Sequence, residues 1–316
     1  MAAAPIPIVF ISDDNFVMQT VVAISSLLAH KAPATRYDIR VVMAECSDAA
    51  RNRFSALPGV TLVTASLDEY REIRQLAHIP IACLLKFNVC ELLPDVDKLL
   101  YLDGDIVVRG DLTPLYETPL GENVAAACSQ LMCLADGQPR INAGVMLFNA
   151  KKMRDERIRE QLVSTRKSLG DRGSMDQQSF NLVLAGRIGA LSPVWNCIPQ
   201  QLDEAVAAYG MERVNGLFGT DYESLPAALS AAQIIHFATS FKPWKYVHVP
   251  CGDEWYAAYL ASPCGGAPLK RVGKWEARAL RARAALRERG LFGLVRYAAQ
   301  GVKKKLSRDN DAVKWG

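Results

Sequence analysis

The sequence has few of the residues that build most metal and redox clusters. Histidine occurs only 4 times among 316 residues, and none of the 8 cysteines forms a Cys-x-x-Cys pair. A site built from several histidines or from paired thiolates is therefore disfavoured. Several cysteines lie in apolar stretches, where a thiol behaves as a small hydrophobic group, so we expect them to be reduced and structural.

Long apolar runs are also lacking. No segment approaches the roughly 20 consecutive apolar residues that a membrane-spanning helix needs. The N-terminus, from Met1 to Pro5, has neither a basic start nor an apolar signal core. With 50% hydrophobic residues the chain can still bury a large core. We expect a globular protein that is made and kept in the cytoplasm.

The net charge of +4 is unevenly distributed. Residues 270–316 contain 14 Lys and Arg against 4 Asp and Glu, so the net positive charge lies entirely in this tail. Leucine and aromatic residues are interleaved with the charges, a pattern typical of amphipathic helices on an anionic membrane face. A solvated basic helix packed on the main domain and a nucleic-acid patch are the alternatives, but the leucine and aromatic residues that accompany the charges favour a membrane surface. We expect residues 263–316 to form a basic helical tail at the inner face of the cytoplasmic membrane, with no nucleic-acid partner.

Apolar runs typical of strands alternate with segments of helical periodicity. The strands are expected at 7–11, 37–43, 60–64, 98–102, 106–108, 123–128 and 143–148, and the helices at 17–30, 47–57, 68–77, 82–93, 151–169 and 177–185. This alternation predicts an α/β domain over residues 1–262, with a doubly wound, mostly parallel sheet flanked by helices. In such a sheet, ligands bind at the carboxyl ends of the strands.

Two acidic loops are expected at that edge of the sheet. Asp103 and Asp105 follow the strand at 98–102, and Asp13-Asp14-Asn15 follows the first strand. Two carboxylates two positions apart can hold one divalent cation, which in turn can hold a diphosphate. Asp-Gly-Asp is also ordinary turn chemistry, so the pair alone does not separate a metal site from a turn.

Five short polar motifs, including these two acidic loops, follow one another along the chain. They are Asp13-Asp14-Asn15, Tyr101-Leu102-Asp103-Gly104-Asp105, Asn142-Ala143-Gly144-Val145, the segment from Asp176 to Asn181, and His236 followed by Lys242-Pro243-Trp244. In these motifs, from about Ile8 to Trp244, the chain resembles the family 8 retaining glycosyltransferases, which include bacterial lipooligosaccharide galactosyl- and glucosyltransferases and glycogenin. The resemblance implies a GT-A type fold and metal-dependent transfer of galactose or glucose from a UDP-sugar to a saccharide. That acceptor would be a lipid-linked one, such as lipooligosaccharide, lipopolysaccharide or another cell-surface glycan.

The resemblance assigns a role to each matched position. Asp103, Asp105 and His236 would bind Mn²⁺ or Mg²⁺, because oxygen-rich coordination with one imidazole suits these ions. The nucleotide and its diphosphate would be held by residues from separate parts of the chain, namely Ile11, Asp13, Asn15, Lys86, Gly104 and Lys242. Lys86 stands where relatives commonly carry arginine, so the charge is kept without the bidentate fork. Thr239 likewise replaces a glycine that is common in the closing loop.

A second group would face the donor sugar and the acceptor. Asp176 would bind sugar hydroxyls and Gln177 would lie near the anomeric carbon, both in catalytic positions. Asn142, Ala143 and Gln130 would line the same pocket. A helix cap at Asp14 or Asn15, a cap at Asp176 and a turn at Asn142 remain open alternatives.

The residues also bear on the mechanism and on other functions. No carboxylate nucleophile is evident, which favours front-side attack over double displacement. A sugar-nucleotide pyrophosphorylase would want a glycine-rich, basic loop after the first strand, where this chain has Asp13-Asp14-Asn15. A membrane-associated saccharide- or nucleotide-binding protein without turnover is a further alternative.

Overall fold

The computed structural model describes residues 4–73, 80–170, 176–266, 269 and 271–273. Two compact units make up the chain: Met1–Thr239 with Glu254–Ala267, and Ser240–Asp253 with Pro268–Gly316. Most of the tail expected at 263–316 lies outside the described residues. None of the described helices combines the length and the hydropathy that crossing a membrane requires.

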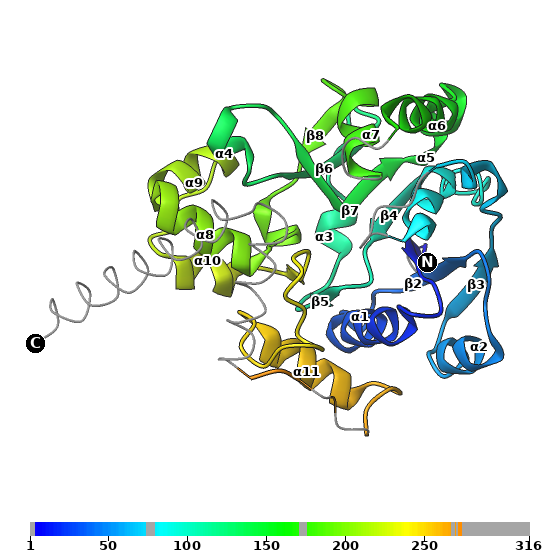
Figure 1. The fold of residues 1–316 in the computed structure, drawn as a ribbon, viewed down its shortest axis with the longest axis horizontal. Helices are drawn as coiled ribbons and strands as arrows, with labels where there is room; N and C mark the ends of the chain where they lie inside the picture. Colours follow the sequence, from blue (N-terminus) through cyan, green and yellow to red (C-terminus); the bar gives the residue numbers. More distant parts are fainter. Residues whose placement is uncertain (1–3, 74–79, 171–175, 267–268, 270, 274–316) are drawn as a thin grey trace, which may run out of the picture. The chain divides into compact units, whose positions relative to one another are not determined.

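A seven-stranded sheet is the framework of the first unit (Figure 1). In spatial order its strands are β3 (Val60–Thr64), β2 (Tyr37–Met43), β1 (Ile6–Ile11), β4 (Lys98–Leu102), β7 (Ile141–Asn149), β6 (Ala125–Ser129) and β8 (Ile188–Ala190). Strand β7 pairs antiparallel with β4 and β6, whereas the other strand pairs described in this sheet are parallel. The predicted doubly wound, mostly parallel sheet is confirmed, with one reversed strand inside it.

A separate two-stranded ladder joins distant parts of the chain. Strand β5 (Ile106–Val108) pairs antiparallel with β9 (Ile234–His236), and Ile106 lies opposite His236. The ladder continues by one bond, because the Phe237 N–H donates to the Asp105 carbonyl oxygen at 2.9 Å. This pairing brings the segment after β4 next to the end of β9.

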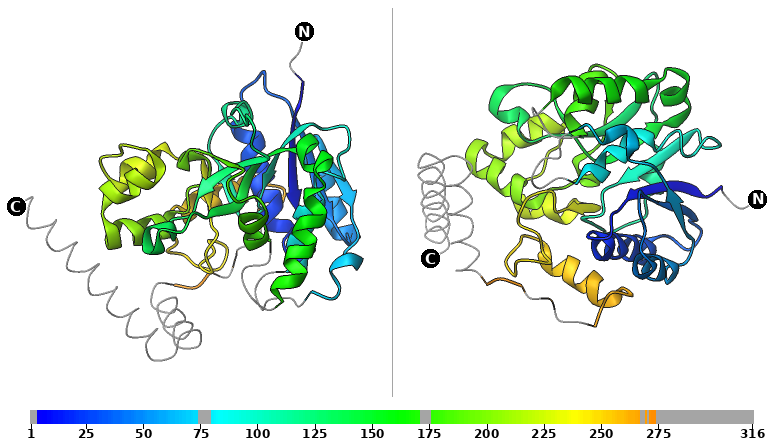
Figure 2. Two further views of the ribbon diagram at one scale, coloured as in Figure 1. Left: turned by 90° about the horizontal axis from the view of Figure 1, so that it is seen from above. Right: turned by 45° about the vertical axis from the view of Figure 1, so that its right-hand side comes forward.

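Helices flank the sheet, and Figure 2 shows them from two further directions. The α-helices are α1 (Val17–His30), α2 (Asp48–Ser55), α3 (Thr113–Tyr116), α4 (Cys133–Asp136), α5 (Ala150–Asp155), α6 (Ile158–Leu169), α7 (Gln177–Val183), α8 (Pro199–Tyr209), α9 (Met211–Phe218), α10 (Leu225–Ala231) and α11 (Gly252–Ala261); the 3₁₀ helices are η1 (Asp68–Tyr70), η2 (Ile81–Asn88) and η3 (Pro193–Trp195). Helix α1 shows how the pattern acts, since Val21, Ile24 and Leu27 lie three residues apart and are fully buried.

Three predicted helices differ in the structure. The helix expected at 68–77 is a single 3₁₀ turn, η1, within the residues described there, and the helix expected at 82–93 is the shorter 3₁₀ helix η2. Burial of the consecutive residues 84–87 replaces the one-sided packing of an amphipathic α-helix. The helix expected at 151–169 is broken at Arg157, which has a φ of 53°. The break allows both Met153 and Ile158 to be fully buried, although residues five apart do not share a face of one α-helix.

Three phenylalanines pack η2, β7 and α7 against one another, and these elements carry several residues of the candidate site. The ring of Phe180 on α7 lies 5.4 Å from that of Phe87 on η2 and 5.7 Å from that of Phe148 on β7. All three side chains are fully buried. Aromatic pairs at these distances add stability beyond the area they bury, so η2, β7 and α7 are held in a fixed relative position.

Candidate active site

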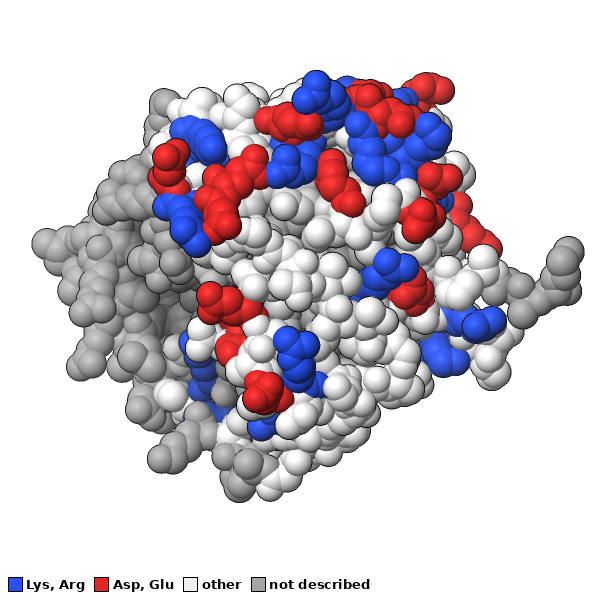
Figure 3. All heavy atoms as spheres, turned by 90° about the vertical axis from the view of Figure 1, so that its right-hand side faces the viewer, with Lys and Arg blue, Asp and Glu red and all other residues white. Residues whose placement is uncertain are grey.

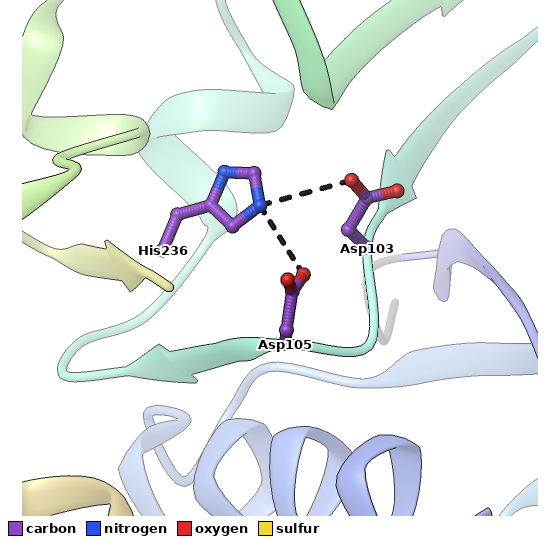
Figure 4. Close-up of side chains that lie close together, drawn as sticks. All are labelled: Asp103, Asp105 and His236. Atoms are coloured by element: carbon purple, nitrogen blue, oxygen red, sulfur yellow. Dashed lines mark ion pairs between the residues drawn. The ribbon is translucent and has the colours of Figure 1, made fainter. Parts of the chain in front are cut away.

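Two carboxylates and one imidazole converge where β4 ends and β5 begins. His236 Nε2 lies 3.2 Å from Asp105 Oδ1 and 3.7 Å from Asp103 Oδ2, and Figure 4 shows both carboxylates directed at the ring. One ligand atom from each residue lies within 4.8 Å of the others. The structure thus brings together the three side chains that the sequence analysis names as metal ligands.

The cluster depends on two glycines. A Cβ on Gly144, in β7, would lie 2.2 Å from His236 Cε1 and 2.8 Å from Asp103 Oδ2. A Cβ on Gly104 would lie 2.5 Å from Thr20 Oγ1 on α1. Because Cβ atoms do not approach other atoms so closely, both positions require a residue without a side chain. The Asp-Gly-Asp segment is therefore shaped to bring its two carboxylates against β7 and β9.

The donor set of this cluster fits a divalent cation. Two carboxylates and one imidazole offer hard oxygen ligands with a single nitrogen. His236 is 2% exposed, whereas the side chain of Asp103 is 31% exposed. The cluster is buried at His236 and Asp105 and partly exposed at Asp103, where further ligands from a bound molecule can approach.

Lys86 ties the cluster to a neighbouring carboxylate. Its ammonium group is buried and lies 2.5 Å from Asp176 Oδ2 and 3.4 Å from Asp103 Oδ1, and it donates to the Ala143 carbonyl oxygen at 2.9 Å. Burial lowers the pKa of Lys86, but the carboxylates of Asp103 and Asp176 outweigh it and raise the pKa above its ordinary value. Lys86 therefore stays charged, and its three N–H groups are directed at protein oxygens.

Most of the residues expected to face the donor sugar lie in β7 or at the start of α7. Gln177, the first residue of α7, accepts hydrogen bonds at Oε1 from the Ala143 N–H at 3.2 Å and from Asn142 Nδ2 at 3.3 Å. Asn142 lies inside β7, so the turn reading is wrong. Asp176 precedes α7 but makes no side-chain hydrogen bond that caps the helix within the described residues. Asp176 thus occupies the N-cap position, as the alternative interpretation expects, but its carboxylate pairs with Lys86 and does not cap the helix.

The residues expected to hold the nucleotide follow β1. Ile11 ends this strand and is buried. One carboxylate oxygen of Asp13, Oδ1, is buried and finds no hydrogen-bond partner among the described residues. Asn15 is exposed, and neither Asp14 nor Asn15 caps α1, whose N-cap is Phe16. The cap expected at one of them is wrong because the chain makes a turn there, in which the Phe16 N–H donates to the Asp13 carbonyl oxygen.

Two further predicted site residues, Gln130 and Lys242, have neighbours of their own. Gln130 follows β6, and its backbone N–H donates to the Arg140 carbonyl oxygen at 2.8 Å. Lys242 belongs to the second unit, where its Nζ lies 5.6 Å from the centre of the Trp244 ring. The roles of Gln130 and Lys242 stay predictions.

One residue of the site was not singled out from the sequence. Asn196 is 7% exposed, and its Oδ1 lies 2.8 Å from His236 Nδ1, from which it can accept a hydrogen bond. It follows η3 in a stretch that the sequence analysis did not assign to any element. An asparagine 40 positions before a histidine carries no local signal that the two side chains meet.

Comparisons with known proteins agree with this geometry. Residues 7–248 match the sequence profile of the family described as glycosyl transferase family 8. Glycosyltransferase GlyE of Streptococcus pneumoniae is 32% identical over 176 residues, which are 55% of this chain and 40% of GlyE. Glycosyltransferase GlyD of the same organism is 26% identical over 248 residues, 75% of this chain and 28% of GlyD. The chain thus spans less than half the length of these two relatives.

A solved structure resembles the chain over more of its length. The galactosyltransferase LgtC, in complex with donor and acceptor sugar analogues, superposes with a TM-score of 0.70 and 25% identity. The match covers 83% of this chain and 98% of LgtC. This likeness supports the GT-A type of the fold.

We expect Gly144→Ala to weaken divalent-cation binding at least tenfold, because the new Cβ would displace His236 or Asp103. Gly216→Ala is the matched control, since a Cβ on that glycine in α9 meets open space. Titration with Mn²⁺, followed by the electron paramagnetic resonance signal of the unbound ion, measures the affinity. Wild-type affinity in a folded Gly144→Ala protein would contradict the account of the cluster.

Proposed function

The chain belongs to glycosyl transferase family 8, and from that membership we propose that it transfers a hexose, galactose or glucose, from a UDP-sugar to a saccharide acceptor. We propose further that the reaction depends on Mn²⁺ or Mg²⁺ and retains the configuration at the anomeric carbon. The observation that carries the proposal is the convergence of Asp103, Asp105 and His236 beside Lys86 and Asp176. A cation-binding cluster next to a buried carboxylate that can accept from sugar hydroxyls suits a sugar diphosphate.

The cluster would provide the electrostatic part of the reaction. Asp103, Asp105 and His236 would hold the cation, which neutralises charge that develops on the leaving diphosphate. Lys86 would keep the carboxylates of Asp103 and Asp176 at a fixed separation. The diphosphate and the sugar of one donor molecule could then be bound at the same time in the orientation that transfer requires. The role of Lys86 is thus one of positioning, because a direct contact with the diphosphate would require it to leave one of its oxygen partners. The buried Oδ1 of Asp13 finds no partner among the described residues, which supports a hydrogen-bond donor of the nucleotide as its partner.

The surroundings of Gln177 and Asp176 favour front-side attack. Gln177 Oε1 already accepts two hydrogen bonds, and Asp176 is paired with the ammonium group of Lys86. Both interactions draw electron density away from these oxygens, which makes each a poor nucleophile. The leaving phosphate would then take the proton of the acceptor hydroxyl, and attack on the same face would retain the configuration.

LgtC, named a galactosyltransferase, supports galactose as one candidate hexose, and it supports a saccharide as the acceptor. A pyrophosphorylase is not proposed, since the family transfers glycosyl groups. For the acceptor we propose a lipid-linked saccharide, such as lipooligosaccharide, lipopolysaccharide or another cell-surface glycan. The support is the basic, leucine- and aromatic-containing tail at residues 270–316.

We also propose that this tail holds the enzyme at the inner, anionic face of the cytoplasmic membrane. On the face in Figure 3, basic and acidic side chains of the described residues are interspersed. That face offers no broad basic surface to an anionic lipid. The membrane proposal is assigned to the tail because of its own charge, 14 Lys and Arg against 4 Asp and Glu in residues 270–316.

Release of UDP from a panel of sugar nucleotides, with Mn²⁺ and an acceptor saccharide, tests the proposed reaction. We expect one UDP-hexose to be turned over in the presence of acceptor, and chelator to abolish turnover. Asp103→Ala should lower kcat/KM at least a hundredfold, because it removes both a cation ligand and a partner of Lys86. Turnover that is unchanged both by chelator and by Asp103→Ala would contradict the cation-dependent mechanism.

Truncation tests the proposed role of the tail. In the second unit Val272 pairs with Tyr246, and its N–H donates to the Lys245 carbonyl oxygen at 2.7 Å, so the chain is best cut after Gly273. We expect this protein to keep its activity on a small soluble acceptor and to lose sedimentation with anionic liposomes. Neutral liposomes are the control for the full chain, and equal sedimentation of the full and truncated chains would refute the assignment.

A further inference from the structure

A row of side-chain amides connects His236 with the start of α7. His236 Nδ1 lies 2.8 Å from Asn196 Oδ1, Asn196 Nδ2 lies 2.9 Å from Asn142 Oδ1, and Asn142 Nδ2 lies 3.3 Å from Gln177 Oε1. His236, Asn196 and Asn142 are each at most 8% exposed. Water therefore has little access to replace these hydrogen bonds, and the buried amides must find their partners within the protein.

The backbone places Asn196 beside the histidine. Cys197, the next residue, forms a parallel bridge with Ile235. Its N–H donates to the Ile234 carbonyl oxygen at 3.0 Å, and the His236 N–H donates to the Cys197 carbonyl oxygen at 2.7 Å. Two backbone bonds thus fix the chain on both sides of the contact between Asn196 and His236.

Two peptide groups decide which way the amides point. The oxygen and nitrogen of an amide side chain cannot be told apart by shape, and the hydrogen bonds must assign them. The Gly144 N–H donates to Asn142 Oδ1 at 3.0 Å, and the Ala143 N–H donates to Gln177 Oε1 at 3.2 Å. A peptide N–H can only donate, so both of these atoms are oxygens.

The orientation of the Asn142 amide in β7 determines which nitrogen of the His236 imidazole carries the proton. Asn142 Oδ1 is an acceptor, so Asn196 must approach it with its NH₂ group, which leaves the Asn196 oxygen facing His236. That oxygen can only accept, so Nδ1 of a neutral His236 must carry the proton. The unprotonated nitrogen is then Nε2, which lies 3.2 Å from Asp105 Oδ1.

We propose that Asn196 is a positioning residue that holds His236 in its Nδ1–H tautomer, so that the Nε2 lone pair is ready to bind a cation. The orientation of the amide groups in the row is set by the Gly144 and Ala143 peptide N–H groups and is passed to Asn196 through Asn142. This inference rests on the proposed function for its consequence in turnover, but the tautomer itself does not. Second-shell hydrogen bonds of this kind fix the orientation and basicity of ligand histidines.

The tautomer can be observed directly in the full-length protein. In the metal-free protein labelled with ¹⁵N-histidine, at a pH where the imidazole is neutral, long-range ¹H–¹⁵N correlation spectra distinguish Nδ1–H from Nε2–H. His236→Gln identifies the His236 signals among the 4 histidines. We expect the Nδ1–H form for His236. The Nε2–H form in the wild-type protein would overturn the proposal.

Two variants of Asn196 separate positioning from general structural damage. Asn196→Leu removes the acceptor, so we expect the Nδ1–H form to be lost and Mn²⁺ affinity to fall about 10–100-fold. Asn196→Asp keeps an acceptor oxygen, so we expect it to keep the Nδ1–H form. Asn52→Leu, at an exposed position of α2, is the control that should change neither property.

Each outcome bears on a separate claim. Unchanged tautomer and unchanged Mn²⁺ affinity in Asn196→Leu would refute the positioning role. If Asn196→Leu does not fold, the wild-type spectrum and Asn196→Asp still decide the question, because loss of the Nδ1–H form in a folded Asn196→Asp protein counts against it. A protein that shows the predicted tautomer but transfers no sugar would contradict the proposed function and leave this inference standing.

Discussion

The short ladder between β5 and β9 is the constraint on which the site depends. Ile106 pairs with His236, and the Phe237 N–H reaches the Asp105 carbonyl oxygen, so residues far apart in the sequence are fixed by main-chain hydrogen bonds. Backbone pairing sets positions within a fraction of an ångström, which a ligand cluster requires. Without it, Asp103 and Asp105 would be a polar turn after β4, as the sequence alone allows.

The reversed strand β7 connects that ladder to the rest of the site. It presents Gly144 to the imidazole, the Ala143 carbonyl oxygen to Lys86, and Asn142 to both Asn196 and Gln177. One strand thus lets the imidazole approach closely at Gly144 and gives the Lys86 ammonium group a carbonyl partner. It also sets the orientation of the side-chain amides. The buried ammonium group of Lys86 in turn joins Asp103 of the cluster to Asp176.

The sequence predicted the strands and the first helix in the first half of the chain well, because their periodicity is strong, but not the segments that form η1 and η2. The bounds of β2, β3 and α1 match the predictions to the residue. Residues 199–231 carry no comparable signal, since α8, α9 and α10 bury only a few residues each, and these helices were not predicted. The ligand residues could be named because they stand in short motifs. Asn196 could not be, because its role arises from strand pairing that no local pattern records.

The central claim is that Asp103, Asp105 and His236 bind one divalent cation together. Anomalous diffraction at the manganese absorption edge, from crystals of the full chain grown with Mn²⁺ and UDP, tests it most directly. The account predicts a single peak within bonding distance of both carboxylates and of His236 Nε2, with diphosphate oxygens completing the coordination. A manganese peak bonded elsewhere, with none at this cluster, would contradict it.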